Sequence, residues 1–342
     1  KGHGELASDS TGETGFSVAR GEIEKQNYKV EDLVLLQTPE VPQDASILII
    51  AGPKTDPMES EMESIRAYIK RGGSVLVMLN PFKTPLLAAL LKEYGFVTAE
   101  DIVVDRMSRA MGGDYLLPVI MTYIQFPITK NFNMASFFPE TRSVRVENKT
   151  AQGIEAQELA MTSPVSWTIN EEQLKSGNAN FDEKTGTKGP ISVMAVSQVT
   201  VPDSKEKAQT EAKEAQETDS KDTGSGGGDQ SPQEENVKSA GEPAKPQKAR
   251  IVVLGSAQVA ANKYFKLQGN GDLFMNTISW LAEDENLISI RPKSPKAQPF
   301  VLTAREAVIF FLVPVLIMPL AWIVAGIAVY IYRRRMVRAA EG

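Results

Sequence analysis

Apolar positions in the first third of the chain follow the periods of strands and helices in turn. Residues 47–50 form a continuous apolar run, as expected for a strand that is buried on both faces. Methionine and isoleucine then recur at helical spacing over 58–69, and a second apolar run covers 75–79. We therefore predict a β-α-β unit with a right-handed crossover. Asp56 is expected to cap its helix, and Glu59 to complete a capping box.

The same alternation extends in both directions and predicts an α/β fold, with a mostly parallel sheet and helices on both faces. Strands are expected at 32–37, 101–104, 143–148, 191–201 and from 249, and helices at 16–28, 84–96 and 271–284. The aromatic and aliphatic residues of the last helix are interpreted as its core-facing side. They are Leu273, Phe274, Ile278, Trp280 and Leu281.

The composition changes between residues 205 and 248. Glu, Lys, Gln, Ser and Gly dominate there, and no aromatic residue occurs. Such a segment cannot bury enough apolar surface to offset the entropy lost on ordering. We predict a disordered low-complexity insert that divides one α/β domain into 1–204 and 249–296. A linker between two separate domains is the alternative, but the part after the insert is too small to be a domain.

The region near the end of the chain has the pattern of a membrane anchor. Residues 307–332 include no charged residue, and this run exceeds the ~20 residues that a helix needs to cross a bilayer. We predict one C-terminal transmembrane helix there, and a buried core helix is the alternative. Arg333, Arg334 and Arg335 flank it more densely than the basic residues that precede it. By the positive-inside rule, the tail 333–342 is expected to be cytoplasmic and the main domain extracytoplasmic.

Charge and motifs exclude several classes of protein. The net charge of −6 argues against a nucleic-acid-binding protein. The absence of cysteine excludes disulfides, thiolate metal sites and a cysteine nucleophile. No phosphate-binding loop or dinucleotide fingerprint is present, so the chain itself is not expected to hydrolyse ATP. A single histidine cannot form a multi-histidine metal site. We therefore predict no catalytic residue, no cofactor and no metal.

Polar residues follow the expected parallel strands, where ligands bind in open α/β sheets. A crevice at these strand ends would suit a sugar or a peptide. The alternative is that these are ordinary turns, because turns after strands are polar in any fold. The candidate ligand residues are His3, Glu5, Lys54, Asn80, Ser256 and Asn262.

Several blocks occur in an order that resembles a known family. They are "KGHGE", "ILIIAGPKT", "YIKRGGSVLVMLNP", "PITKNF", "IVVLGSAQVAANKYF", "GNGDLFMNTISWLAEDENLISIRPK" and the apolar terminal run. Together they resemble the GldG-like auxiliary components of gliding-motility-type ABC transport systems. The resemblance implies an inner-membrane protein whose partners are a multi-span permease and a cytoplasmic ABC ATPase.

The resemblance also implies an amidotransferase/flavodoxin-like α/β domain, similar to class I glutamine amidotransferases and to a domain of an intraflagellar-transport protein. Amidotransferase chemistry needs a cysteine, which this chain lacks. The chain also carries Gln125 and Phe126 where a histidine is expected before the proline, so no role of that histidine is carried over. Because "KGHGE" reads as the turn after a strand, we expect upstream sequence with a first strand and a first membrane helix.

Three functions are compatible with these observations. The first is a non-catalytic accessory subunit of an ABC transporter, anchored in the lipid bilayer, whose outer domain contacts substrate or an envelope partner. The second is a membrane-tethered module that binds a glycan or a peptide. The third is a hydrolase that uses Ser256 or an acidic pair such as Glu5 and Asp56. Adjacent genes for a permease and an ATPase would favour the first function.

Overall fold

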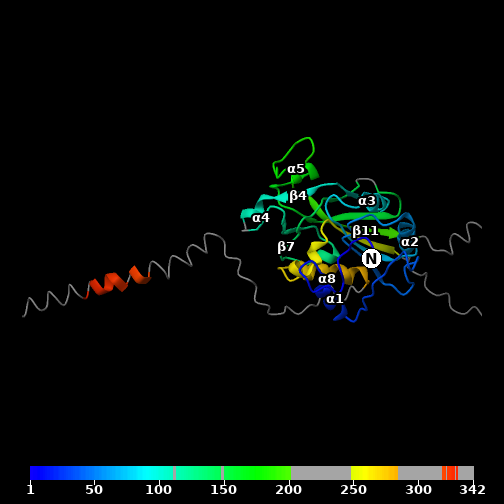
Figure 1. Ribbon diagram of the computed structural model, residues 1–342, viewed down its shortest axis with the longest axis horizontal. Coiled ribbons are helices and arrows are strands. Elements are labelled where there is room, and N and C mark those ends of the chain that lie inside the picture. The colour runs from blue at the N-terminus through cyan, green and yellow to red at the C-terminus, as the bar shows by residue number, and fades with distance from the viewer. Residues whose placement is uncertain are drawn as a thin grey trace, which may run out of the picture.

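A computed structural model describes residues 1–110, 113–147, 150–201 and 248–283, together with 318–320, 322–327 and 329. Figure 1 shows a mixed α/β body built on one central sheet. The sheet has the order β1-β2-β12-β11-β9-β6. Its strands are β1 (Ile47–Ala51), β2 (Ser74–Met78), β12 (Lys248–Leu254), β11 (Ser192–Thr200), β9 (Ile154–Met161) and β6 (Thr122–Tyr123).

The expectation of a mostly parallel sheet is wrong. The pairs β1–β2 and β2–β12 are parallel, but β12–β11, β11–β9 and β9–β6 are antiparallel. A parallel neighbour needs a crossover of a dozen or more residues, which is usually a helix. Between β9 and β11 the chain forms only the short strand β10 (Ser166–Ile169) and helix α5 (Glu171–Lys175), so the chain returns antiparallel. The predicted β-α-β unit occurs in the parallel half.

Helices cover both faces of the sheet, as the apolar pattern predicted. On one face lie α1 (Ser17–Glu24) and α8 (Asn270–Leu281), and on the other lie α2 (Glu59–Lys70) and α3 (Pro85–Lys92). Successive side chains of a strand point to opposite faces. The side chains of Leu76 and Met78 accordingly join the first face, and those of Val75 and Val77 join the second.

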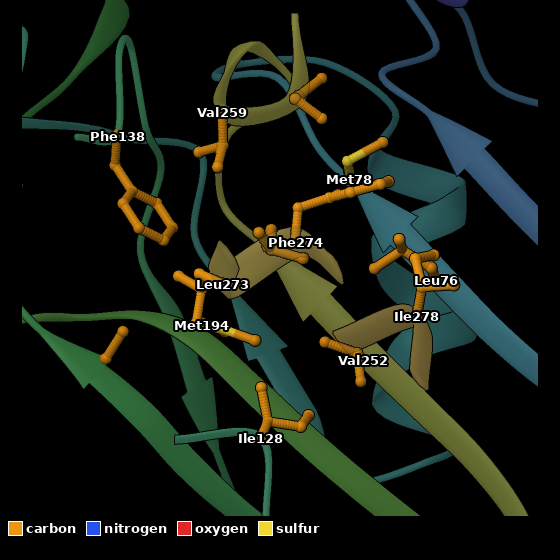
Figure 2. Close-up of a cluster of buried hydrophobic side chains, with 14 of the residues drawn as sticks. Leu76, Met78, Ile128, Phe138, Met194, Val252, Val259, Leu273, Phe274 and Ile278 are labelled. Carbon is orange, nitrogen blue, oxygen red and sulfur yellow. The ribbon is translucent and has the colours of Figure 1, made fainter. Parts of the chain in front are cut away.

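The first of these two cores contains the predicted apolar side of the last helix (Figure 2). All five side chains expected to face the core are at most 2% exposed, which confirms that expectation. The Phe274 ring packs edge-on against Phe16 of the segment before α1 and against Phe265, with centroid distances of 5.7 Å in both pairs. Burial of each such side chain contributes roughly 1.5–3 kcal/mol.

Shorter elements surround the central sheet. The predicted strand at 101–104 forms as β4 (Ile102–Asp105), but it pairs antiparallel with β10 in a separate two-stranded sheet. The predicted strand at 143–148 forms as β8 (Val144–Val146) and pairs with β3 (Phe96–Thr98). The remaining elements are β5 (Val119–Ile120), β7 (Ser136–Phe137), α4 (Arg106–Ala110), α7 (Asn262–Phe265), η1 (Pro127–Thr129) and η2 (Gln258–Ala260).

The capping expectations for α2 were wrong in detail. The carboxylate of Asp56 accepts a hydrogen bond from the Leu87 amide at 2.9 Å, so it caps α3 instead of α2. The box at the start of α2 is made by Glu61, whose carboxylate accepts from the Met58 amide at 2.8 Å. Asp56 and Glu61 both lie near the start of α2 in sequence. Only the three-dimensional path of the chain shows that Asp56 caps α3 and that Glu61 caps α2.

The strand predicted at 32–37 is not present; this segment is irregular and enters a turn at residue 35. Two of its three leucines, Leu33 and Leu35, still pack against the second core, whereas Leu36 is exposed. Together with Ile47 and Ile49 of β1, the two packed leucines line a cavity of about 510 Å³. A strand needs a ladder partner for its backbone groups, and no described strand lies between this segment and β1.

The predicted insert and anchor fall mainly outside the described residues. The strands that flank the insert pair with each other, and Thr200 lies opposite Lys248. Described helical pieces of the anchor are 318–320, 322–327 and 329, and the tail with Arg333, Arg334 and Arg335 is not described. Within the described part of the chain, no helix has the length and hydropathy that a membrane span requires. The domain boundaries and the span therefore stay predictions.

Candidate functional site

The N-terminal turn is held by one histidine between two carboxylates. His3 Nε2 lies 3.0 Å from Glu61 Oε2 of α2, and His3 Nδ1 lies 3.5 Å from Glu5 Oε1. All three side chains are largely buried, with 11% of His3 and Glu5 and 3% of Glu61 exposed. Because Glu61 also caps α2, the three residues join the beginning of the chain to that helix.

The Glu5 carboxylate is further stabilised by backbone donors. Burial raises the pKa of Glu5, but hydrogen bonds from backbone amides outweigh burial, so that the pKa lies below its usual value. The amides of Gly2 and His3 donate to Oε2 at 3.0 and 2.8 Å. These backbone donors therefore favour the ionised form of the Glu5 carboxylate.

Lys54 and Asn80 lie near the same turn and support it. The Lys54 amide donates to the His3 carbonyl at 2.7 Å, while its side chain is exposed. Asn80 Nδ2 donates to the Gly52 carbonyl at 2.9 Å. Gly52 has a φ of +67°, and a Cβ there would meet the Ala257 side chain at 2.4 Å. This loop is thus closed by backbone contacts at the ends of β1 and β2.

Ser256 and Asn262 are occupied by backbone groups. Ser256 is fully buried, donates to the Pro139 carbonyl and accepts from the Gln258 amide. Asn262 Oδ1 accepts from the Val18 amide at 2.9 Å, which caps the start of α1. Its Nδ2 donates to the carbonyls of Ser10 and Gly12 at 2.8 Å each. Both residues hold loops in place, so their polar groups already have partners.

Arg142 also holds loops at the strand ends, and the sequence did not indicate this role. It is fully buried, and its guanidinium donates to the Ala99 carbonyl from Nε at 2.8 Å and from Nη2, and to the Lys83 carbonyl at 2.9 Å. Burial lowers the pKa of Arg142, and the carboxylates of Asp101 and Glu100 oppose that change. The guanidinium joins the loops that follow β2 and β3. Nothing in its local sequence marks it, because its partners are distant carbonyls.

The structure therefore separates the six candidate residues into two groups. His3 and Glu5 line the 510 Å³ cavity beside β1, together with apolar residues of β1 and further charged residues such as Lys1, Asp32 and Glu61. Lys54, whose side chain is exposed, belongs with Asn80, Ser256 and Asn262, which hold backbone segments together. Among the described residues, no cluster of three or more His, Cys, Asp or Glu is arranged to hold a metal ion. Binding of a ligand at these strand ends stays a prediction.

Comparison with known families defines the class of protein. The model of the ABC-type uncharacterized transport system family matches residues 1–282, which is most of the chain. The chain therefore belongs to this family of auxiliary components of ABC transport systems.

Comparisons with individual proteins add less. No curated protein matches the chain. The "mmIFT52 N-terminal domain" is 16% identical, with a TM-score of 0.45, and the match covers 77% of this chain and 89% of that one. A ThuA-like protein from Bacteroides uniformis is 14% identical, with a TM-score of 0.38, and the match covers 78% and 83% of the two chains. These resemblances are too distant to support an argument about function.

Proposed function

We propose that this chain is a non-catalytic, membrane-anchored accessory subunit of an ABC transporter of the export or gliding-motility type, a GldG-like component. The observation that supports this proposal most strongly is the family match over residues 1–282. The chain lacks a phosphate-binding loop, so a separate cytoplasmic ATPase supplies the energy. A multi-span permease is the second partner.

In this proposal the segment 307–332 crosses the inner membrane once and lies against the permease. Its 26 uncharged residues suffice for a span, and the arginines that follow it favour a cytoplasmic tail. The α/β domain then stands outside the cytoplasm, where it contacts the transported substrate or an envelope partner. Its central sheet is covered on both faces by packed cores.

The hydrolase hypothesis has little support from the contacts of its candidate residues. Ser256 Oγ already donates to the Pro139 carbonyl, so no base is placed to activate it. Asp56 caps α3 through the Leu87 amide. The binding-module hypothesis has more support, because an aromatic-lined groove is present on the small β4–β10 sheet. Such a module is compatible with the accessory role.

Co-purification tests the proposal. The full chain and a matched variant that ends at Thr303 are expressed in the native host and extracted in mild detergent, and the bound proteins are identified by mass spectrometry. The full chain is expected to bring down a multi-span permease and an ABC ATPase, and the truncated variant to lose both. Recovery of neither partner by the full chain, while other ABC complexes in the same extract stay intact, would refute the proposal.

A further inference from the structure

A second concave surface lies far along the chain from the candidate residues, on the two-stranded β4–β10 sheet. It is an open groove of about 710 Å³ between β10, the loop after α5 and the start of α4. Three aromatic side chains line it: Tyr115, Trp167 and Phe181. Tyr115 is 42% exposed, and Trp167 and Phe181 are each partly exposed. Aromatic residues are usually buried for core packing, so three accessible rings in one groove point to binding.

The groove is preorganised by hydrogen bonds. Trp167 Nε1 donates to the Ala179 carbonyl at 2.8 Å, which fixes the edge of the indole and leaves its ring available. Gln173 holds the same loop, since its side chain donates to the Asn180 carbonyl at 3.0 Å and its carbonyl accepts from the Asn178 amide. Asn178 and Asn180 line the groove, and Asn178 Oδ1 accepts a hydrogen bond from the Asn180 backbone amide at 3.2 Å. A preformed surface with rings and amide groups is the usual composition of a small-ligand site.

The charge of the groove is opposite to that of the protein. Arg106 and Lys188 line it, and none of its lining residues is acidic, although the whole chain has a net charge of −6. Arg106 is exposed and makes no hydrogen bond or ion pair with any described residue. Lys188 Nζ lies 4.8 Å from the Phe181 ring centroid, and its ion pair with Glu183, at 3.8 Å, is exposed and therefore weak. The groove thus favours an anionic ligand.

The backbone of the groove argues against a peptide strand as the ligand. A bound peptide normally pairs with a free strand edge. On the β10 side, the Thr168 amide donates to the Thr187 carbonyl at 2.9 Å, and the Ser166 carbonyl accepts from Gly189. On the β4 side, the amide of Val103 donates to Thr141 and that of Asp105 to Tyr115. With these ladder positions taken, the groove offers rings, amides and cations instead of a free edge.

We propose that this groove binds an acidic glycan, a polysaccharide whose sugars carry carboxylate groups. The apolar faces of pyranose rings stack on Trp167 and Phe181, because both surfaces are flat and apolar. The Nδ2 group of Asn178 donates to sugar hydroxyls, and the side-chain amide of Asn180 donates to and accepts from them. Arg106 and Lys188 pair with the carboxylates, the guanidinium by two parallel hydrogen bonds. The proposal rests on the groove alone and is independent of the proposed transporter association.

The test uses the full chain in detergent micelles, with tetragalacturonic acid as the probe and isothermal titration calorimetry at low salt. Binding is expected, and the double variant R106Q/K188Q should weaken it at least about tenfold, since each charge-assisted hydrogen bond supports roughly that factor. The matched control is K70Q/K266Q, which removes two exposed positive charges elsewhere and should leave binding unchanged. Maltotetraose, a neutral sugar of the same length, is expected to bind at least about tenfold more weakly.

The aromatic contribution is tested separately. Trp167→Ala should reduce tetragalacturonic acid binding at least about tenfold, and Trp167→Phe, which keeps a flat ring, should restore most of it. Phe181→Ala provides a second test in a loop position, should Trp167→Ala disturb β10. Circular dichroism of every variant checks that the domain is folded.

Three outcomes would overturn the proposal. The first is the absence of tetragalacturonic acid binding, and the second is binding that the groove variants leave unchanged. The third is binding of hexaglutamate with equal or higher affinity, which would assign the groove to acidic peptides. Failure of co-purification with a permease would leave the groove unaffected, so the two proposals fail in distinguishable ways.

Discussion

Replacement of Arg142 by lysine tests whether its guanidinium holds together the loops that follow β2 and β3. From a fully buried position, the guanidinium donates to the carbonyls of Ala99 and Lys83 and, at a longer 3.5 Å, to the Asn80 carbonyl. A lysine ammonium is a single charged point on a flexible stem, so it cannot satisfy both the Ala99 and the Lys83 carbonyl. Each buried carbonyl that loses its donor costs about 1–3 kcal/mol. An ammonium is also more strongly hydrated in water than a guanidinium, so its burial costs more. We therefore expect a loss of about 2–4 kcal/mol in the free energy of unfolding.

The assay is urea unfolding of the purified full chain in mild detergent, followed by near-ultraviolet circular dichroism. The matched control is Arg145→Lys, three residues further along, where the side chain is half-buried and shows no hydrogen bond among those the structure describes. The control should unfold within about 0.5 kcal/mol of the wild type. If Arg142→Lys also unfolds within about 0.5 kcal/mol of the wild type, the guanidinium does not hold these loops, and the reasoning about this edge is wrong.

Three further predictions concern the other residues near the strand ends. Asn262→Asp keeps the acceptor for the helix cap but removes the donors to the carbonyls of Ser10 and Gly12. Urea unfolding should therefore show a loss of about 2–4 kcal/mol in the free energy of unfolding. A loss below about 0.5 kcal/mol would contradict the role of Asn262 in holding these loops. Glu5 has a lowered pKa in the folded protein, so it stabilises the fold above its usual pKa, near 4.5, and this stabilisation is lost as the pH falls toward the folded value. Unfolding measured against pH should therefore show the advantage of the wild type over Glu5→Gln shrinking below about pH 4.5, whereas a constant advantage would exclude the carboxylate as its source. Gly52→Ala should lower the free energy of unfolding by more than about 2 kcal/mol, because φ is +67° and the new Cβ would meet the Ala257 side chain at 2.4 Å. Gly21→Ala in α1, where a Cβ meets nothing within 4 Å, should raise it by about 0.5–1 kcal/mol. Thermal unfolding distinguishes the two variants, and equal effects would contradict this reasoning.

The parallel half of the fold was predictable from local pattern. The apolar runs of β1 and β2 and the helical spacing of α2 each carry their own signal, because a strand buried on both faces and an amphipathic helix leave different periods. The change in composition between β11 and β12 predicts an insert there, and this segment lies outside the described residues. The antiparallel half was not predictable, since the direction of a strand depends on its connection and on its neighbours.

The candidate site illustrates a different limit. Residue type predicted polar side chains near the strand ends, but it could not show that Asn262, which lies in α7, and Ser256 hydrogen-bond to backbone groups. Arg142 gave no signal, because its partners are carbonyls more than forty residues away in one case and nearly sixty in the other. The groove around Trp167 was also missed, since its rings come from three separate segments that appear as ordinary core residues in sequence.

The central claim is that the terminal apolar segment holds this chain against a transporter permease. A photo-reactive amino acid placed in turn at positions 322, 323, 324 and 325 samples every side of the helix, because successive residues are about 100° apart. After irradiation of intact native membranes, at least one position is predicted to cross-link to a multi-span permease, while a control at Lys70, on the exposed surface of α2, should not. Cross-links to lipid alone at all four positions, in membranes that contain the permease, would contradict the account.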